Sequence, residues 1–239
     1  MPNISVIIPT LNEENYIGSL LQALQKQTIK PKEIIVVDGH SSDNTQKIVK
    51  QFKHVKLLFS IKNPALQRTI GGKKASGDLL IFLDADVFPQ KNFLEKVLLL
   101  HNKKHFNIAC PFYVGYPGSL TINAVYGVFD FIFFLFQNIW PSGAGSCIII
   151  EKKVFEVENG FNSAYTYDDI EFIRRAAKKR KFCIVPLLLK VSDRRFRKYG
   201  TLSMLAQYLL LSIFFIVNQF GAANKVPYVF DGYNEKNYK

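Results

Sequence analysis

Residues 79–86 read Leu-Leu-Ile-Phe-Leu-Asp-Ala-Asp, an apolar run that ends in two aspartates. A short apolar run bounded by polar residues predicts a buried strand over Leu79–Leu83. Asp84 and Asp86 then follow the strand, and two carboxylates at this spacing can share a hard divalent cation such as Mg²⁺ or Mn²⁺. They can also divide a metal and a ribose between them, or form a plain solvated turn. The buried strand in front of them favours a binding role.

The sequence before residue 79 alternates short apolar runs with helical patterns. We expect strands over Ile4–Ile8, Glu33–Val37 and Val55–Phe59. Between them we expect helices over Asn15–Gln27, from a cap at Ser42 or Asp43 to about Phe52, and over Pro64–Ala75. Strands separated by helices indicate βαβ units. The predicted fold is therefore α/β, with a mostly parallel sheet flanked by helices on both faces.

Polar residues follow three of these strands, at Pro9–Glu13, Asp38–Asp43 and Asp84–Asp86. In open α/β sheets, ligands bind beyond the carboxyl ends of the strands, where the strand order reverses. We therefore expect the three polar loops to converge on one ligand site.

The composition restricts the class of protein. The chain has 239 residues, of which 48% are apolar and 21% charged, so a disordered chain is excluded. Its formal charge of +12 favours an anionic partner: nucleic acid, an acidic membrane surface or a phosphorylated substrate. Three separated cysteines without a CxxC pair predict neither a zinc site nor a disulfide framework. The first residues lack a basic, apolar leader, so we expect no signal peptide.

Four motifs occur in a fixed order: Val6-Ile-Ile-Pro-Thr-Leu-Asn-Glu-Glu14, Val37-Asp-Gly-His-Ser-Ser-Asp-Asn-Thr45, Ala75 to Asp86, and Gly160-Phe161 before Asp168-Asp-Ile-Glu171. Together they resemble the family 2 glycosyltransferases with the Rossmann-like GT-A fold. The resemblance covers about residues 3–198. It implies an inverting transferase that moves a hexose from a nucleotide sugar, a UDP- or GDP-sugar, to an acceptor.

The resemblance also implies roles for individual residues. The nucleotide would contact Pro9, Thr10, Asn12, Glu13, Asp38, Gly39, Arg68, Asp84 and Ala85, with the Asp38 carboxylate on the base. Asp86, with Asp84, would hold the Mg²⁺ or Mn²⁺ that bridges the diphosphate. The sequence departs from the family at Thr69, where asparagine is more usual, and at Phe88, where some relatives carry a polar metal ligand.

The general base of the family falls at the second acidic residue of its late motif. This implies Asp169, with Asp168 as the alternative, as the carboxylate that takes the proton of the acceptor hydroxyl. The competing interpretation is structural, because Thr166 and Asp169 have the spacing of a helix capping box.

A basic cluster runs from Arg194 to Lys198. Guanidinium groups suit phosphate, so Arg195, together with Arg194, Arg197 or Lys198, is predicted to contact the diphosphate or the acceptor. A solvated loop or one that faces lipid headgroups is the alternative. The loop Ser142–Ser146, with Gly145, resembles the family loop beside the donor sugar. The sequence has no Gln-x-x-Arg-Trp motif, which argues against a processive synthase.

Two apolar segments extend the catalytic domain, which we place at 1–200, with an apolar helix and polar tail at 201–239. Leu120–Trp140 predicts an interfacial or buried helix, because Asp130 interrupts it. Leu202–Phe220 has no formal charge, and it could span a bilayer, lie in the interface or form a homodimer surface. These segments favour attachment to the cytoplasmic face of the cell membrane and a lipid-linked acceptor such as a polyprenyl phosphate.

Three other functions are less favoured by the sequence. A sugar nucleotidylyltransferase would show a glycine-rich basic loop near the N-terminus, which is absent. A non-catalytic nucleotide-sugar-binding protein at the membrane need not keep Asp38, Asp84, Asp86 and Asp169 together. Nucleic-acid binding rests on net charge alone, and we expect none.

Overall fold

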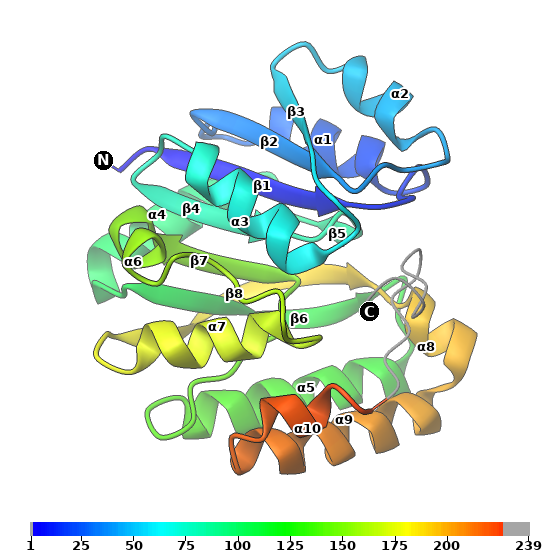
Figure 1. Cartoon of the computed structure of the whole chain (residues 1–239), viewed down its shortest axis with the longest axis vertical. Coiled ribbons are helices and arrows are strands. Elements are labelled where there is room, and N and C mark those ends of the chain that lie inside the picture. The colour runs from blue at the N-terminus through cyan, green and yellow to red at the C-terminus, as the bar shows by residue number, and fades with distance from the viewer. Residues whose placement is uncertain (1, 227–239) are drawn as a thin grey trace.

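The computed structural model describes residues 2–226 and contains one mixed sheet flanked by helices (Figure 1). Within these residues the strand order is β3-β2-β1-β4-β7-β6-β8-β5. The strands are β1 (Ile4–Thr10), β2 (Glu33–Asp38), β3 (Val55–Phe59), β4 (Leu79–Leu83), β5 (Val87–Phe88), β6 (Ile108–Tyr116), β7 (Cys147–Glu151) and β8 (Phe182–Ser192). The helices are α1 (Ile17–Gln25), α2 (Thr45–Lys50), α3 (Pro64–Lys74), α4 (Phe93–Lys104), α5 (Leu120–Phe136), α6 (Lys152–Val157), α7 (Asp168–Ala177), α8 (Arg194–Tyr199), α9 (Thr201–Ile216) and α10 (Phe220–Ala223).

The first half of the chain follows the predicted βαβ pattern. Strands β3, β2, β1 and β4 are parallel neighbours, and Thr10 pairs with Asp38 at the carboxyl edge. Helix α3 begins at Pro64, where the side chain of Asn63 accepts a hydrogen bond from the amide of Leu66. Helix α2 ends at Lys50, slightly earlier than predicted.

The second half corrects the prediction of a mostly parallel sheet. Strand β7 lies antiparallel between β4 and β6, and β5 pairs antiparallel with β8. Parallel neighbours need a crossover connection. The chain instead enters β7 from the loop that lies beside the end of β4, where the amide of Asp84 donates to the carbonyl of Ser146. Strand β7 must therefore run back along β4 in the opposite direction.

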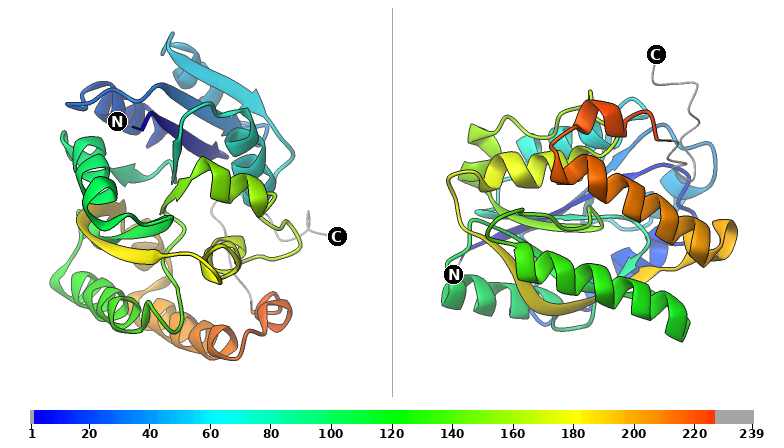
Figure 2. Two further views of the ribbon diagram at one scale, coloured as in Figure 1. Left: turned by 90° about the vertical axis from the view of Figure 1, so that its left-hand side faces the viewer. Right: turned by 90° about the horizontal axis from the view of Figure 1, so that it is seen from below.

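Two apolar clusters cover the two faces of the sheet. Helices α1 and α4 pack on one face through Leu20, Leu21 and Leu94, among others. Helices α3, α6 and α7 pack on the opposite face, where Phe155 and Phe172 lie. Helices α5, α9 and α10 form a further layer beyond β6, at the bottom of Figure 1, with α5 and α9 side by side in both views of Figure 2.

The two apolar segments fold as short helices in this layer. Helix α5 ends at Phe136 and turns the Asp130 side chain inward, while Leu202–Phe220 contains most of α9 and the first residue of α10. Within residues 2–226, none of the helices combines the length and the hydrophobicity that a membrane span requires. Residues 227–239 of the predicted tail lie outside the described part.

Candidate active site

Two cavities meet at the carboxyl ends of β1 and β4. A cavity of about 200 Å³ and a smaller one of about 60 Å³ share four lining residues, Arg68, Asp84, Asp86 and Arg195. Of the predicted site residues, Pro9, Glu13, Ala85 and Arg194 line the smaller cavity only, and Gly145, Asp168 and Asp169 line the larger one only. Glu13 of the first motif and Asp169 of the last motif, far apart in the sequence, thus line cavities that share Asp84 and Asp86.

The polar end of the smaller cavity is held by one arginine between two carboxylates. The two terminal nitrogens of Arg194 donate to the carboxylate oxygens of Glu13 at 2.7 and 2.8 Å. Its Nε lies 3.1 Å from Oδ2 of Asp86. Burial raises the pKa of Glu13 to about 7 in spite of the arginine. Burial also raises the pKa of Asp86, and the neighbouring charge of Asp84 adds to this effect.

Asp38 is fully buried, and its carboxylate is engaged within its own loop. It accepts hydrogen bonds from the amide and hydroxyl of Ser41 and from the side chain of Gln46. Asn12 ties this loop to the end of β1, because its amide donates to Ser41 and its side-chain oxygen accepts from Ser42. Sequence reasoning expected Asp38 on the nucleotide base. The structure uses the Asp38 side chain to shape the loop, and Asp38 lines neither cavity.

Thr10 and Gly39 belong to the same hydrogen-bond network between the ends of β1 and β2. The Gly39 amide donates to the carbonyl of Thr10, and the Gln67 side chain donates to the carbonyls of Thr10 and Val37. Both residues are buried and line neither cavity. They hold the ends of β1 and β2 together rather than facing the open space.

Arg68 is a buried bridge between the two carboxylate motifs. One of its terminal nitrogens donates to both carboxylate oxygens of Asp168, at 2.9 and 3.1 Å, and the other donates to Asp84 at 3.0 Å. The guanidinium also lies 5.6 Å from the ring centre of Phe161. Burial disfavours the charged form, but the nearby carboxylates outweigh it and raise the pKa of Arg68 still further. Arg68 thus belongs to an internal ion-pair network and also lines both cavities, and its contact with the nucleotide stays a prediction.

Asp168 and Asp169 begin α7 but have different surroundings. Asp168 is buried and held by Arg68, while burial and the Asp169 charge raise its pKa to about 7. The Asp169 carboxylate accepts from its neighbour's amide at 2.9 Å and faces the larger cavity. Burial raises the pKa of Asp169 as well. The predicted capping box is wrong, since Tyr167 occupies the N-cap position without a side-chain cap bond.

Gly145 lies directly against Asp169. A Cβ atom at this position would overlap the Asp169 carboxylate, so only glycine lets the loop approach so closely. The loop is fixed from the other side by Tyr113, whose hydroxyl donates to the carbonyl of Ala144 at 2.8 Å. Gly145, which the sequence placed in the loop beside the donor sugar, thus packs against the predicted base Asp169.

The basic cluster separates into two groups. Arg195 lines both cavities and Arg194 lines the smaller one. Arg197 forms an ion pair with Asp193 at 2.7 Å, and the Lys198 ammonium lies 5.2 Å from the ring centre of Tyr199. Neither of these two lines either cavity, so the geometry does not bring them to the predicted diphosphate position.

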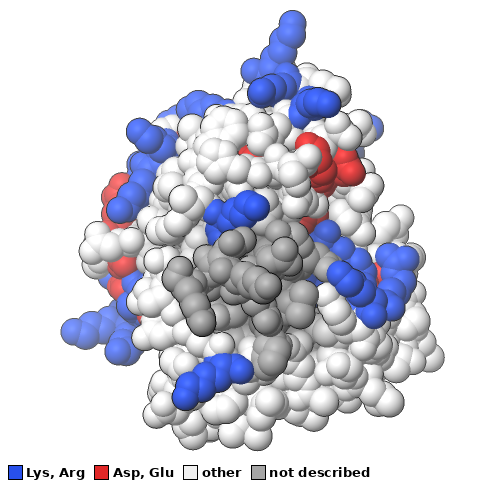
Figure 3. Space-filling model, turned by 45° about the vertical axis from the view of Figure 1, so that its right-hand side comes forward, with Lys and Arg blue, Asp and Glu red and all other residues white. Residues whose placement is uncertain are grey.

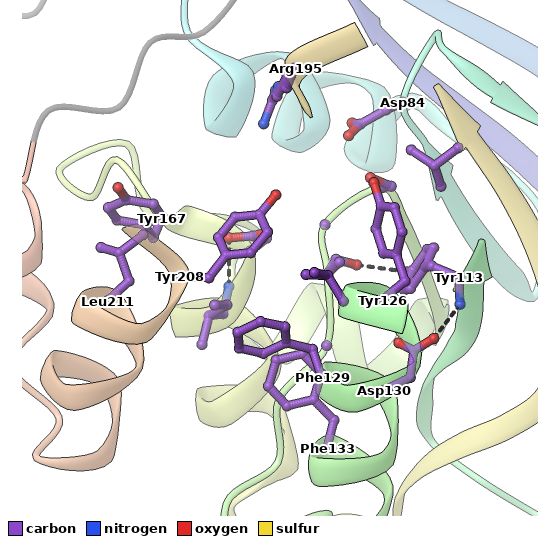
Figure 4. Close-up of a pocket in the computed structure, with 18 of the residues that line it drawn as sticks. Asp84, Tyr113, Tyr126, Phe129, Asp130, Phe133, Tyr167, Arg195, Tyr208 and Leu211 are labelled. Atoms are coloured by element: carbon purple, nitrogen blue, oxygen red, sulfur yellow. Dashed lines mark hydrogen bonds between the residues drawn. The ribbon is translucent and has the colours of Figure 1, made fainter. Parts of the chain in front are cut away.

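The wall of the larger cavity is aromatic. Helices α5 and α9 turn their inner faces toward Asp84 and Arg195, with Asp130 at the floor accepting from the amide of Tyr113 (Figure 4). The rings of Phe129 and Tyr208 meet across the two helices at 5.5 Å. The wall includes Tyr126, Phe129, Phe133, Tyr208 and Leu211.

Comparison with known proteins agrees with this geometry. The sequence profile described as Glycosyl transferase family 2 matches residues 5–157. The chain belongs to glycosyltransferase family 2. It is 37% identical over 111 residues to an uncharacterised glycosyltransferase of Haemophilus influenzae, covering 44% of each chain. It is 33% identical over 93 residues to GalNAc(5)-diNAcBac-PP-undecaprenol beta-1,3-glucosyltransferase of Campylobacter jejuni, covering 36% of this chain and 30% of that one.

The matched stretches therefore span less than half the length of these two curated relatives. Among solved structures, the mannosyltransferase PcManGT of Pyrobaculum calidifontis, in complex with GDP-Man and Mn²⁺, superposes with a TM-score of 0.74. The superposition covers 95% of this chain and 66% of PcManGT at 18% identity, which shows a shared fold. The family and GT-A-like fold predicted from the motifs are confirmed.

The metal-ligating side chains of this family 2 transferase fit a divalent cation that takes most of its ligands from the substrate. Within residues 2–226 no group of three or more His, Cys, Asp and Glu side chains could enclose a metal. Asp84 and Asp86 supply two carboxylates from one loop. Mg²⁺ and similar cations are commonly held by one or two carboxylates plus substrate phosphates and water.

The sequence analysis missed the aromatic wall of the transferase site, although it identified Leu120–Trp140 and Leu202–Phe220 as apolar segments. The relevant signal was the spacing of Tyr126, Phe129 and Phe133, which places three rings on one face of a helix. It also missed the pairing of Glu13 with Arg194. No local sequence pattern predicts this pair, because the two residues lie far apart in the sequence.

Proposed function

We propose that this chain transfers a sugar from a nucleoside-diphosphate sugar to an acceptor by metal-dependent, inverting displacement, with Asp169 as the general base. The observation that carries the proposal is the junction of the two cavities at Asp84, Asp86, Arg68 and Arg195. One side of this junction is narrow and lined by the motif residues of the family. The other side is wide, aromatic and bordered by Asp169. A donor and an acceptor bound on the two sides would meet at the shared carboxylates.

The difference between the two aspartates supports Asp169 as the base. Both oxygens of Asp168 accept hydrogen bonds from Arg68, which leaves this carboxylate poorly suited to take a proton. Both aspartates line the larger cavity, and burial raises the pKa of both. The difference lies in their partners, because the Asp169 carboxylate accepts from the amide of Ile170 and not from a guanidinium. An acceptor hydroxyl beside Asp169 would lose its proton to the carboxylate while its oxygen attacks the anomeric carbon.

The donor would lie in the smaller cavity with its diphosphate toward Asp84, Asp86 and Arg195. A bound Mg²⁺ or Mn²⁺ would neutralise the charge that develops on the leaving nucleoside diphosphate. Arg195 lines both cavities, so its guanidinium can contact diphosphate oxygens from the protein side. The GDP-Man and Mn²⁺ named for the Pyrobaculum mannosyltransferase support this class of donor and cation.

The acceptor side is suited to an amphipathic molecule. Aromatic and aliphatic side chains from α5 and α9 form most of its wall, while the reacting end is polar. A lipid-linked saccharide or a polyprenyl phosphate has this combination of an apolar chain and a polar end. The undecaprenol-linked substrate in the name of the Campylobacter relative supports the same class.

Thermal unfolding with nucleotides tests the donor site. We expect UDP or GDP, or one of their sugars, to raise the Tm of the purified protein only with Mn²⁺ or Mg²⁺ present. A ligand at a hundred times its dissociation constant stabilises the native state by about 2.7 kcal/mol. The Asp86→Ala variant, compared with its own ligand-free Tm, should lose the shift.

Asp78→Ala is the matched control, because Asp78 precedes β4 whereas Asp86 follows it, and the Asp78 carboxylate accepts a hydrogen bond from the amide of the exposed Asn3. It should keep the full shift. A shift that survives Asp86→Ala, or the absence of a shift with every nucleotide, would contradict the proposed donor site. Transfer to a short water-soluble acceptor at the rate seen with a lipid-linked one would contradict the acceptor class.

A further inference from the structure

Two segments of the chain are nearly free of charge. Residues 106–150 contain one charged side chain, Asp130, and residues 199–224 contain none, although the whole chain has 31 lysines and arginines and 19 aspartates and glutamates. These segments supply α5, α9 and α10. Helices at a water-exposed surface normally carry charged and polar residues on their outer face. Since Asp130 is buried, the outer faces of α5 and α9 carry no charge at all.

The outer faces of these two helices are instead apolar and exposed. On α5 they present Phe131, Leu135 and Val128, and on α9 Leu202, Leu209 and Ile213. The inner faces line the cavity and meet through Phe129 and Tyr208, so neither helix has a polar side. An extended exposed apolar patch on a soluble domain marks an interaction surface. We call the outer faces of α5 and α9 the apolar face.

Basic residues flank the apolar face. Helix α8, with Arg197 58% exposed, leads directly into α9, and the exposed Lys225 follows α10. In Figure 3 the lower part of the visible surface, formed by the α5–α9–α10 layer, is largely white with blue side chains at its margins. The single tryptophan of the chain, Trp140, follows α5 and packs on Phe136. Tryptophan is enriched where protein meets the lipid–water interface.

We propose that the apolar face docks onto an anionic lipid bilayer, with α5 and α9 lying in the plane of the interface. Apolar side chains would enter the headgroup boundary while Arg197 and Lys225 contact anionic headgroups. A second copy of the chain would be a poorer occupant. Each copy carries a formal charge of +12, so pairing two basic-rimmed faces brings like charges together.

Vesicle flotation with the whole chain tests this proposal without donor or acceptor. The probes are vesicles of phosphatidylcholine alone and of phosphatidylcholine with phosphatidylglycerol. We expect flotation with the anionic vesicles, a blue shift of the Trp140 emission, and quenching by lipids brominated in their acyl chains. Trp140 is the only tryptophan, so the signal reports the apolar face alone.

A matched pair of double variants separates the apolar face from general surface hydrophobicity. The test variant is Phe131→Ser with Ile213→Ser, at 59% and 61% exposure. The control is Leu99→Ser with Ile61→Ser, at 58% and 65% exposure, in α4 and after β3. Circular dichroism should show both variants folded, because exposed substitutions cost little stability. The test variant should lose flotation by at least tenfold, and the control should float like the native protein.

The charge contribution has its own variant, Arg197→Gln with Lys225→Gln. It should weaken binding to anionic vesicles by about fivefold per residue removed. The proposal is overturned if no vesicle binds and the Trp140 emission is unchanged. It is also overturned if the control loses flotation as the test variant does. A third result has the same meaning: a concentration-dependent dimer, abolished by Phe131→Ser with Ile213→Ser, would assign the face to a second copy.

Discussion

The smaller cavity, the proposed donor side, and the larger cavity, the proposed acceptor side, are built from opposite kinds of residue. The proposed donor side is lined by residues from the loops after β1 and β4, from α3 and from α8. Their polar side chains are bound to one another, such as Glu13 with Arg194 and Arg68 with Asp84. The acceptor side is formed by helices α5 and α9, which contribute rings and aliphatic chains and a single carboxylate, Asp130.

This contrast separates the residues that belong to family motifs from the residues that are particular to this protein. The family profile matches residues 5–157, which include the loops after β1 and β4 and also α5. Helices α7 to α10 lie beyond it. The loops that carry Glu13, Asp84 and Asp86 belong to motifs of fixed order, whereas an apolar wall can be built from many sequences. The polar residues of the site can therefore be predicted from motifs, and the aromatic wall only from composition.

Asp169 is the proposed general base and lines the larger cavity, so its removal should have the largest effect. Asp169→Asn keeps the shape of the side chain but removes the base, and general base catalysis contributes about 10²- to 10⁴-fold. We expect kcat to fall by this factor while nucleotide-induced stabilisation persists. The measurement is steady-state transfer with donor in excess, alongside thermal unfolding with the nucleotide.

The pH profile gives a second measure of the same group. Burial raises the pKa of Asp169, so kcat/KM should fall as the pH drops through that raised value and the base becomes protonated. Asp169→Asn should lose this acidic limb. An Asp169→Asn enzyme that transfers at the native rate would assign the base to another residue.

Arg68 joins the donor loop to α7, and its loss should produce the next largest effect, on stability. Arg68→Met leaves Asp84 and Asp168 without their buried partner, and breaking such a pair costs about 3–5 kcal/mol. Urea unfolding should report this loss. Lys153→Met is the control, because Lys153 is an exposed partner of Glu151 and such surface pairs contribute at most about 1 kcal/mol. Equal losses would show that the Arg68 network does not join the two halves.

The same contrast explains how much could be predicted from the sequence. Strands β1 to β4 were predicted closely because each apolar run is local and ends at turn-forming polar residues. The antiparallel insertion of β7 was not, because it depends on the contact of its loop with Asp84 and not on the strand sequence. The partners of Arg68 were missed for the same reason, since Asp168 lies 100 residues away.

The orientation of helices α5 and α9 could not be predicted, for a different reason. A helix that is apolar on all sides carries no periodic signal to distinguish its inner face from its outer face. The sequence therefore allowed an interfacial or a buried helix for Leu120–Trp140. For Leu202–Phe220 it allowed a spanning helix, an interfacial helix or a dimer surface. Only the packing of Phe129 against Tyr208 shows which rings point into the cavity.

Gly145 tests how tightly the acceptor side is held against the base. In Gly145→Ala the new methyl group would overlap the Asp169 carboxylate, and overpacking of this kind costs about 1–3 kcal/mol. We expect a lower Tm and a lower kcat, with unchanged nucleotide binding. Gly127→Ala in α5 is the control, because nothing lies within 4 Å of its Cβ position, and alanine there should stabilise the helix by about 0.5–1 kcal/mol. A neutral Gly145→Ala would mean that the loop and Asp169 are not in close contact.

Asp130 gives the smallest effect and isolates the one carboxylate of the aromatic wall. Burial raises its pKa from 3.8 to about 7, so the folded chain keeps this proton while the unfolded chain releases it as the pH rises. The group therefore lowers stability progressively between about pH 4 and 7, and by about 1 kcal/mol between pH 6 and 7. Asp130→Asn keeps an acceptor oxygen for the amide of Tyr113 but cannot ionise.

Urea unfolding of both proteins from pH 5 to 8 measures this difference. Stability of the native protein should fall more steeply with pH than that of Asp130→Asn, and the two curves should run parallel above pH 8. Glu13 and Asp168 also have raised pKa values, but they titrate in both proteins and cancel from the comparison. Identical slopes would mean that Asp130 is already ionised near pH 5. The wall of α5 and α9 would then tolerate a buried charge, and the division of the site into a polar donor side and an apolar acceptor side would be less sharp.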